Sequence, residues 1–153
     1  MQPSETIARS AQQRVRAADG DSFSIEKTKL RLRGIDAPEL NQDCIDQDGT
    51  NWACGNAARH GLAALLNQPG LRCEISGYDR FGRGLAICKT AQTADIAASQ
   101  ILHGYAISQE FNGVADYGKE QNEARAAKRG IWRGRFINPR LWRERHHRPG
   151  PTG

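Results

Sequence analysis

Three short segments of the 153-residue sequence gather acidic and basic side chains beside turn residues. They read D-G-D-S (19–22), R-L-R-G-I-D-A-P-E (31–39) and Y-D-R-F-G-R-G-L-A (78–86). A rigid scaffold often presents its binding and catalytic side chains at such loops. A lone D-G-D is usually just a turn, and arginines that alternate with leucines in a strand usually face solvent. The occurrence of all three segments in one short chain is what indicates a common site.

The residue types in these segments suit the cleavage of a phosphodiester bond. Asp21 and Asp36 supply the hard oxygen donors that calcium and magnesium prefer. Glu39 lies close enough in sequence to Asp36 to act in the same cleft as a general base. Arg31 and Arg83 can each offer a planar fork to a phosphate, whereas a lysine would act only as a point charge. A metal ion, a base and guanidinium groups are together what the reaction requires.

The pattern of apolar residues indicates which elements must position these groups. It predicts strands within 14–35, a long loop over 36–50, and a hairpin formed by 71–76 and 84–89. Helices are predicted over 56–67, 94–103 with Thr93 as N-cap, and 117–129. One helix between the third and fourth strands, with further helices at the end, favours an α+β fold. We expect a five-stranded OB-type barrel with about three α-helices.

A chain of this length forms one domain. We expect the domain over 14–132, after a polar leader at 1–13 that can be disordered, and before a basic extension at 133–153. Nine of the 22 lysines and arginines lie between Arg125 and Arg148, where Glu144 is the single acid. Such a segment would attract a polyanion without choosing a sequence. The alternative is a solvated, partly disordered tail.

The four cysteines form no C-x-x-C pair, which argues against a structural zinc site. Cys73 and Cys88 lie opposite each other in the predicted hairpin, so we expect them to pair, and Cys44 and Cys54 would then close a short loop. Two disulfides indicate an oxidising compartment, hence a periplasmic or secreted protein. The alternative is four reduced thiols in the cytosol. The polar N-terminus lacks an apolar stretch, so we expect any signal peptide to be absent from this chain.

The three segments, followed by A-K-R-G-I-W at 127–132, closely resemble the staphylococcal nuclease-like (thermonuclease) family from about Arg14 to Trp132. The W-x-C-G at 52–55 is similar to that of exported bacterial members. The resemblance implies an OB-barrel, dependence on Ca²⁺, and hydrolysis of DNA and RNA to products that carry 3′-phosphates.

The resemblance also implies a role for each matching residue. Asp21 and Asp36 would bind calcium through their carboxylates, with the backbone carbonyl of Ala37 as a further ligand and Asp19 in support. Glu39 matches the general base. The two phosphate-binding arginines correspond to Arg31 and Arg83.

Two positions depart from the usual family pattern. Ala37 replaces a threonine but keeps the backbone carbonyl. Phe81 replaces a tyrosine, so it can stack on a base but cannot donate a hydrogen bond. Phe111 and Tyr117 would be further nucleotide-binding aromatics.

The resemblance leaves other functions open. The barrel could be a catalytically weak or silent nucleic-acid-binding module, or an accessory module in polysaccharide export. The retained acids argue against a simple binder, because carboxylates repel phosphate unless a cation intervenes. We expect sequence-independent binding of DNA and RNA, no membrane partner and a monomer.

Overall fold

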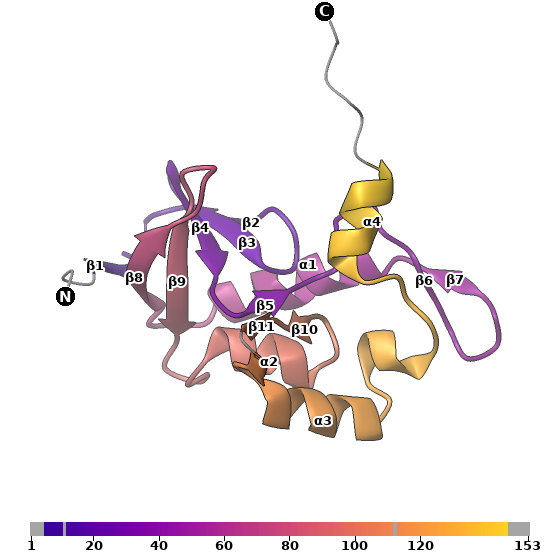
Figure 1. The fold of residues 1–153 in the computed structure, drawn as a ribbon. Helices are drawn as coiled ribbons and strands as arrows, with labels where there is room; N and C mark the ends of the chain where they lie inside the picture. The colour runs from indigo at the N-terminus through magenta and orange to yellow at the C-terminus, as the bar shows by residue number, and fades with distance from the viewer. Residues whose placement is uncertain (1–4, 11, 112, 147–153) are drawn as a thin grey trace, which may run out of the picture.

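The computed structural model describes residues 5–10, 12–111 and 113–146 (Figure 1). Its main sheet has the strand order β1-β8-β9-β4-β3-β2. The strands are β1 (Glu5–Ala8), β2 (Val15–Ala17), β3 (Ser22–Ile25), β4 (Thr28–Leu32), β8 (Arg72–Tyr78) and β9 (Gly84–Lys89). β4 and β9 run parallel, and the other neighbours are antiparallel. The sheet is therefore mixed. Further strands and one helix lie in the long connection from β4 to β8.

Three two-residue ladders complete the strands. β5 (Ile35–Asp36) pairs with β10 (Ile107–Ser108), β6 (Cys44–Ile45) with β7 (Asn51–Trp52), and β11 (Glu110–Phe111) with β12 (Val114–Ala115). β6 lies within the segment predicted as a long loop, 36–50, and β5 spans the boundary between that loop and the predicted strands. Such short strands lack a detectable alternation of side chains, and β5 depends on a partner some 70 positions away in the chain.

The helices are α1 (Cys54–Leu66), α2 (Ile96–Leu102), α3 (Gly118–Ala126), a 3-10 turn η1 (Gly130–Arg133) and α4 (Pro139–His146). The three predicted helices are present with slightly shifted ends. The prediction of Thr93 as the cap of α2 is wrong, because the carboxylate of Asp95 accepts the N–H of Ala98 at 3.3 Å. The hydroxyl of Thr93 lies 2.6 Å from the side-chain oxygen of Gln68 instead.

Two apolar clusters hold these elements together. The larger packs the sheet against α1 and α2, and its fully buried members include Leu30, Leu32, Leu62, Leu66 and Ile101. The smaller joins Cys44, Cys54 and Ile131 to Trp52, Ile107, Trp132 and Phe136. The α+β, OB-like prediction is confirmed. β1 adds an edge strand from the segment expected to be a leader, and α4 adds a fourth helix.

Both expected disulfides are present. Cys44 is bonded to Cys54, and Cys73 is bonded to Cys88, its direct partner in the β8–β9 ladder. All four cysteines are buried. In the described ranges, no helix is long and apolar enough to cross a bilayer.

Removing the barrel disulfide tests how far it stabilises the domain. We expect the Cys73→Ala/Cys88→Ala double variant to lose about 3 kcal/mol of unfolding free energy, as for a closed loop of about 15 residues. Urea unfolding of the oxidised parent and the double variant measures the difference. Equal midpoints with equal slopes would contradict the expectation.

A second prediction concerns the contact between α1 and the loop that carries Glu39. A Cβ on Gly55 would overlap the backbone carbonyl of Glu39, whereas one on Gly77 meets nothing within 4 Å. We expect Gly55→Ala to lower the unfolding free energy by about 1–3 kcal/mol, the usual cost of overpacking. Gly77→Ala is the matched control, and its denaturation midpoint should stay within a small margin of the parent's. Equal midpoints for the two variants would refute the close packing.

Candidate functional site

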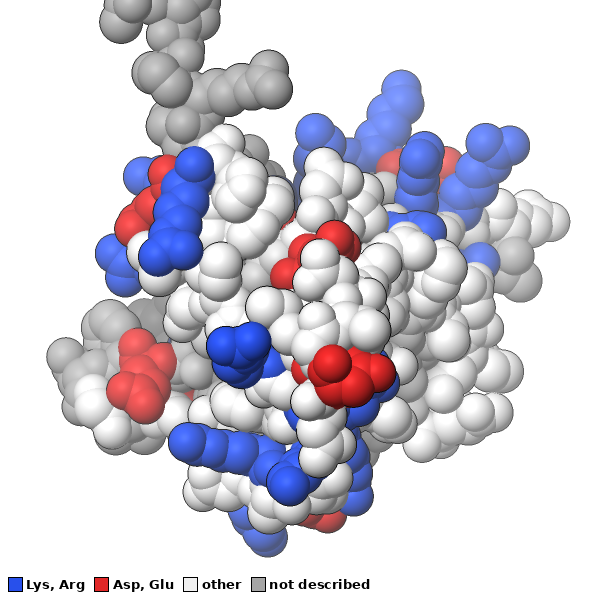
Figure 2. Space-filling view, turned by 90° about the vertical axis from the view of Figure 1, so that its right-hand side faces the viewer, with Lys and Arg blue, Asp and Glu red and all other residues white. Residues whose placement is uncertain are grey.

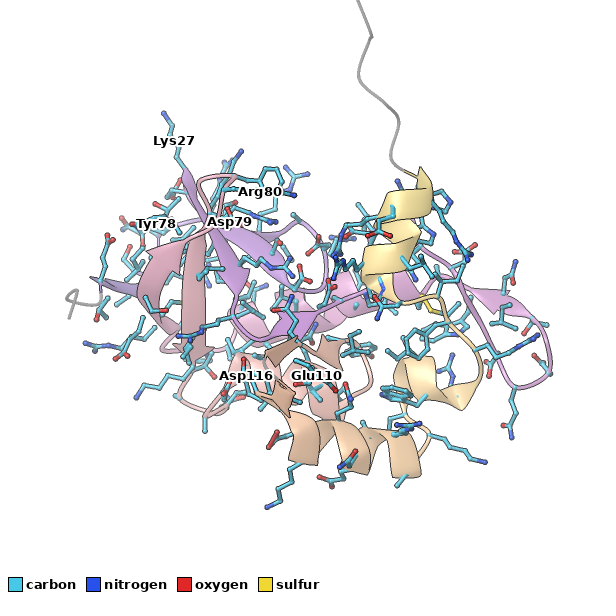
Figure 3. The ribbon with its side chains drawn as sticks, in the orientation of Figure 1. Lys27, Tyr78, Asp79, Arg80, Glu110 and Asp116 are labelled. Atoms are coloured by element: carbon cyan, nitrogen blue, oxygen red, sulfur yellow. A yellow bond between two sulfur atoms is a disulfide. The ribbon has the colours of Figure 1, made fainter. Side chains whose placement is uncertain are left out.

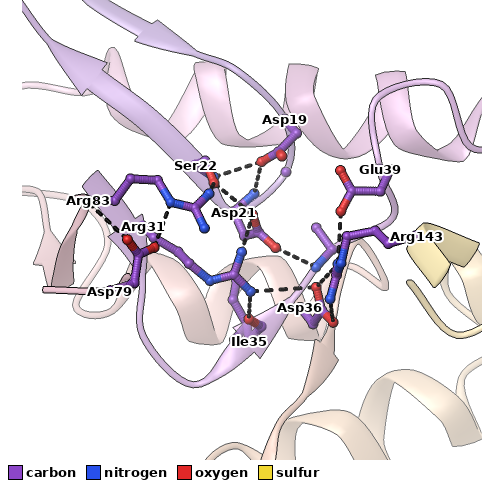
Figure 4. Close-up of polar contacts among 12 residues, drawn as sticks. Asp19, Asp21, Ser22, Arg31, Ile35, Asp36, Glu39, Asp79, Arg83 and Arg143 are labelled. Carbon is purple, nitrogen blue, oxygen red and sulfur yellow. Dashed lines mark hydrogen bonds and ion pairs between the residues drawn. The ribbon is translucent and has the colours of Figure 1, made fainter. Parts of the chain in front are cut away.

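The centre of the candidate site is a pair of buried carboxylates that share one guanidinium (Figure 4). Asp21 precedes β3 and Asp36 ends β5; they are 2% and 4% exposed. Arg31, in β4, directs Nη1 to Oδ1 of Asp21 at 3.2 Å and Nη2 to Oδ1 of Asp36 at 3.5 Å. Its position follows from the strand register, because Arg31 lies directly opposite Ser22 in the β3–β4 ladder. Two sequence segments thus meet at a single arginine.

Asp21 accepts hydrogen bonds within the cluster and has a raised pKa. Its carboxylate accepts the backbone N–H of Ala37 at 2.8 Å and the hydroxyl of Ser22 at 3.0 Å. Burial, followed by the nearby charge of Asp19, raises the pKa of Asp21 to about 7, although Arg31 and the Ala37 N–H oppose the rise. Ionising Asp21 therefore costs free energy that an additional cation would reduce.

Asp19 shapes the turn that presents Asp21. Its Oδ1 accepts the backbone N–H groups of Asp21 at 3.0 Å and Ser22 at 2.8 Å. This local bonding is the usual work of an aspartate in a turn. The negative charge of Asp19 nevertheless lies close enough to Asp21 to raise that residue's pKa.

Arg83 reaches the same cluster from the β8–β9 loop. Its Nε donates to Asp79 at 2.6 Å, and its Nη1 donates to the hydroxyl of Ser22 at 3.1 Å. Asp79 also accepts the N–H groups of Phe81 and Arg83. Burial acts to raise the pKa of Asp79, but these hydrogen bonds outweigh it and lower the pKa. Asp79, which sequence reasoning had not assigned to the site, thus orients the Arg83 fork beside Asp21.

Phe81 lies at the outer end of the same loop. Its side chain is 68% exposed, and the guanidinium carbons of Arg80 and Arg83 lie 5.0 and 5.5 Å from its ring centre. Figure 3 shows Tyr78, Asp79 and Arg80 near Lys27 at one end of the sheet. The loop therefore presents an accessible aromatic ring flanked by cations, an arrangement that can stack on a base.

Glu39 meets Asp36 through a residue that the sequence did not indicate. Arg143, in α4, donates from Nη1 to Glu39 at 2.8 Å and to Asp36 Oδ1 at 2.9 Å, and from Nη2 to Asp36 Oδ2 at 3.1 Å. The hydrogen bonds to Asp36, ahead of those to Glu39, raise the pKa of Arg143. The C-terminal helix thus contributes a third arginine to the cluster.

The segment before α4 is fastened to the loop that follows Glu39. Gln42 is fully buried; its side-chain oxygen accepts the N–H of Glu39 at 3.1 Å, and its amide donates to the carbonyl of Ile137 at 2.7 Å. Ile45 and Arg135 exchange two backbone hydrogen bonds of 2.8 Å. These contacts hold α4 so that Arg143 faces the carboxylates.

Of the two remaining aromatic candidates, Tyr117 is not brought into the cluster. Tyr117 is partly buried; its hydroxyl donates to Asp95 at 2.9 Å, and burial together with that bond raises its pKa. Its ring packs against the main core. Phe111 belongs to β11, but its side chain lies outside the described part of the structure.

A groove of about 820 Å³ adjoins the cluster, with Arg31 and Asp36 in its wall. One side comes from β4, β5 and β9, and the other from the C-terminal segment. Trp132, Phe136, Asn138 and Arg140 line that second side. Glu110 and Asp116, labelled in Figure 3, lie at the edge nearest α3. On the face that carries α4, basic and acidic side chains are interspersed (Figure 2).

The oxygen ligands that the cluster offers are of the kind that a hard divalent cation prefers. Among the described residues, no three acidic, histidine or cysteine side chains gather closely enough to form a metal cluster. Asp21 and Asp36 would therefore supply the two protein carboxylates, and backbone oxygen and water would complete the coordination. Calcium and magnesium are commonly held in this way. The buried negative charge on Asp21 supports such a fit, because its ionised form is poorly compensated.

Comparisons with known proteins place the chain in a family. Residues 29–134, more than half of the chain, match the family described as staphylococcal nuclease homologue. The succinoglycan biosynthesis protein ExoI of Rhizobium meliloti (strain 1021) is 34% identical over 117 residues, which cover 75% of this chain and 61% of that protein.

Two further relatives have nuclease names. A probable staphylococcal-like nuclease CAN2 of Oryza sativa subsp. japonica is 28% identical over 80% of this chain and 31% of its own length. An uncharacterized endonuclease of Haemophilus influenzae is 29% identical over 84% of this chain and 70% of its own. The chain thus spans less than two thirds of the first two relatives. On the family match over residues 29–134, the chain belongs to the staphylococcal nuclease family.

Proposed function

We propose that the protein is a calcium-dependent nuclease that hydrolyses phosphodiester bonds of DNA and RNA without sequence preference and leaves 3′-phosphates. The observation that carries the proposal is the convergence of Asp21, Asp36 and Arg31 at one point, with Arg83 linked to it through Ser22. Buried acids beside a polyanion site suit a metal-assisted reaction better than simple binding, because they would otherwise repel the phosphate.

In the proposed reaction Asp21 and Asp36 would hold calcium with the backbone carbonyl of Ala37, and Asp19 would support them through the turn. A bound calcium ion would supply positive charge to the phosphate oxygens. Ala37 is 2% exposed and has an apolar side chain, so its contribution would be limited to the backbone.

The arginines and Glu39 would carry the remaining steps. Arg31 and Arg83 would bind the phosphate oxygens with their planar forks and stabilise the charge that builds there in the transition state. Glu39 would accept a proton from the attacking water while the oxygen of that water forms a bond to phosphorus. The bond from phosphorus to the 5′-oxygen would break, that oxygen would take up a proton, and the 3′-phosphate would remain on the other product. Phe81 would stack on a neighbouring base.

The two disulfides are compatible with a protein outside the cytoplasm, and we propose a periplasmic or secreted location. The name of the Rhizobium relative refers to succinoglycan biosynthesis. A role of this chain in polysaccharide export is therefore the second candidate. It predicts no nucleic-acid cleavage, so one digestion assay separates the two functions.

Digestion of supercoiled plasmid and of single-stranded RNA tests the proposed activity. With Ca²⁺ we expect cleavage and 3′-phosphate ends, and with a chelator of Ca²⁺ we expect neither. Glu39→Gln and Arg83→Ala should each lower the cleavage rate by about 10²-fold or more, because each group acts mainly in the transition state.

Matched controls come from exposed residues on β8. Glu74→Gln and Arg72→Ala change the same charges away from the cluster and should cut at the parent's rate. Cleavage that persists undiminished in chelator would refute the metal dependence. If Glu39→Gln or Arg83→Ala digested plasmid as fast as the parent, the role given to that residue would be wrong.

A further inference from the structure

Arg143 has an unusual position for a residue of a C-terminal helix. It bonds both oxygens of Asp36, and the same Nη1 also bonds Glu39. The Asp36 side chain is 6% exposed, whereas the side chain of Arg143 is 40% exposed. The arginine therefore enters from the solvent side and covers a buried carboxylate.

This contact is determined by the backbone that leads to α4. Gln42 ties Ile137 to the Glu39 loop, and Pro139 at the start of α4 is fully buried. The side chain of Asn138 accepts the N–H of Arg140 at 2.9 Å, which fixes the first turn of the helix. Because the helix is anchored at its first turn, Arg143 is held one turn further on, over the carboxylates.

A divalent cation and the Arg143 guanidinium would both bind the carboxylate oxygens of Asp36. Arg143 already donates a hydrogen bond to each oxygen of Asp36, and Nη2 of Arg31 lies 3.5 Å from Oδ1, so a cation at Asp36 would have to share these oxygens with two guanidinium groups. Two positive groups on one carboxylate, in a poorly hydrated site, also repel each other. Binding of the cation is therefore coupled unfavourably to the contact of Arg143 with Asp36.

We propose that Arg143 is a built-in competitor at the cation site, whose guanidinium must leave Asp36 before a divalent cation can bind there. The same departure releases the carboxylate of Glu39, since one guanidinium holds both acids. α4 thus sets the affinity of the site for its metal. This inference rests on the proposed function in one respect: that the cation binds at Asp36.

Calorimetric titration of Ca²⁺ into folded protein, without nucleic acid, tests the competition directly. We expect Arg143→Gln to lower the Kd for Ca²⁺ by about tenfold, a typical coupling between two ligands of one site. Arg143→Lys should give an intermediate Kd, because lysine keeps the charge but cannot bond both oxygens of Asp36 as a planar fork. Arg145→Gln, the same charge change at an exposed position of α4, should bind Ca²⁺ as the parent does. Circular dichroism checks that each variant is folded.

An Asp36→Asn variant separates failure of this inference from failure of the proposed function. If Asp36→Asn loses Ca²⁺ binding while Arg143→Gln binds with the parent's Kd, the cation site stands and the competition is refuted. A weaker affinity in Arg143→Gln would also overturn it, since the arginine would then support the metal. If Asp36→Asn binds Ca²⁺ like the parent, the metal site and the inference both fail.

Discussion

Asp21 and Asp36 are both buried, and both lie against the guanidinium of Arg31. Burying two carboxylates costs free energy, and the other groups of the site offset part of that cost. Burial strips both carboxylates of their hydration, and burial together with the nearby charge of Asp19 raises the pKa of Asp21. Positive charge from Arg31 and Arg143 acts in the opposite direction. A cluster of this kind is poorly suited to a nucleic-acid backbone unless a further cation joins it.

The fold supplies this cluster from segments that are distant in sequence. The β3–β4 register sets Arg31 against Ser22, and the hydroxyl of Ser22 then links Asp21 to Arg83 from the β8–β9 loop. The Glu39 loop is fixed by Gln42, which also anchors the segment leading to α4. The barrel and the C-terminal segment therefore share one site, and a substitution in either changes the electrostatics of the other.

Much of this arrangement could be predicted from sequence, because the signals were local. The hairpin pattern identified the partner of Cys73, and turn motifs identified Asp21 and Arg83. β5 and β6 are too short to show alternation, and β5 pairs with a strand some 70 positions away. Arg143 is one of nine basic residues in the C-terminal region, and the sequence did not distinguish it from the others. Asn138-Pro139 was the available signal for α4, since proline is favoured in the first turn of a helix. No local pattern indicates that Arg143 points at Asp36.

If a divalent cation lies between the buried acids and a bound phosphate, as we propose, nucleic-acid binding depends on that cation. The most direct measurement is the binding of a short fluorescent single-stranded oligonucleotide to the Glu39→Gln variant by anisotropy, at constant ionic strength, in Ca²⁺ and in chelator. We expect at least about tenfold tighter binding with Ca²⁺, corresponding to roughly 1.4 kcal/mol. Equal affinity in the two buffers would contradict it.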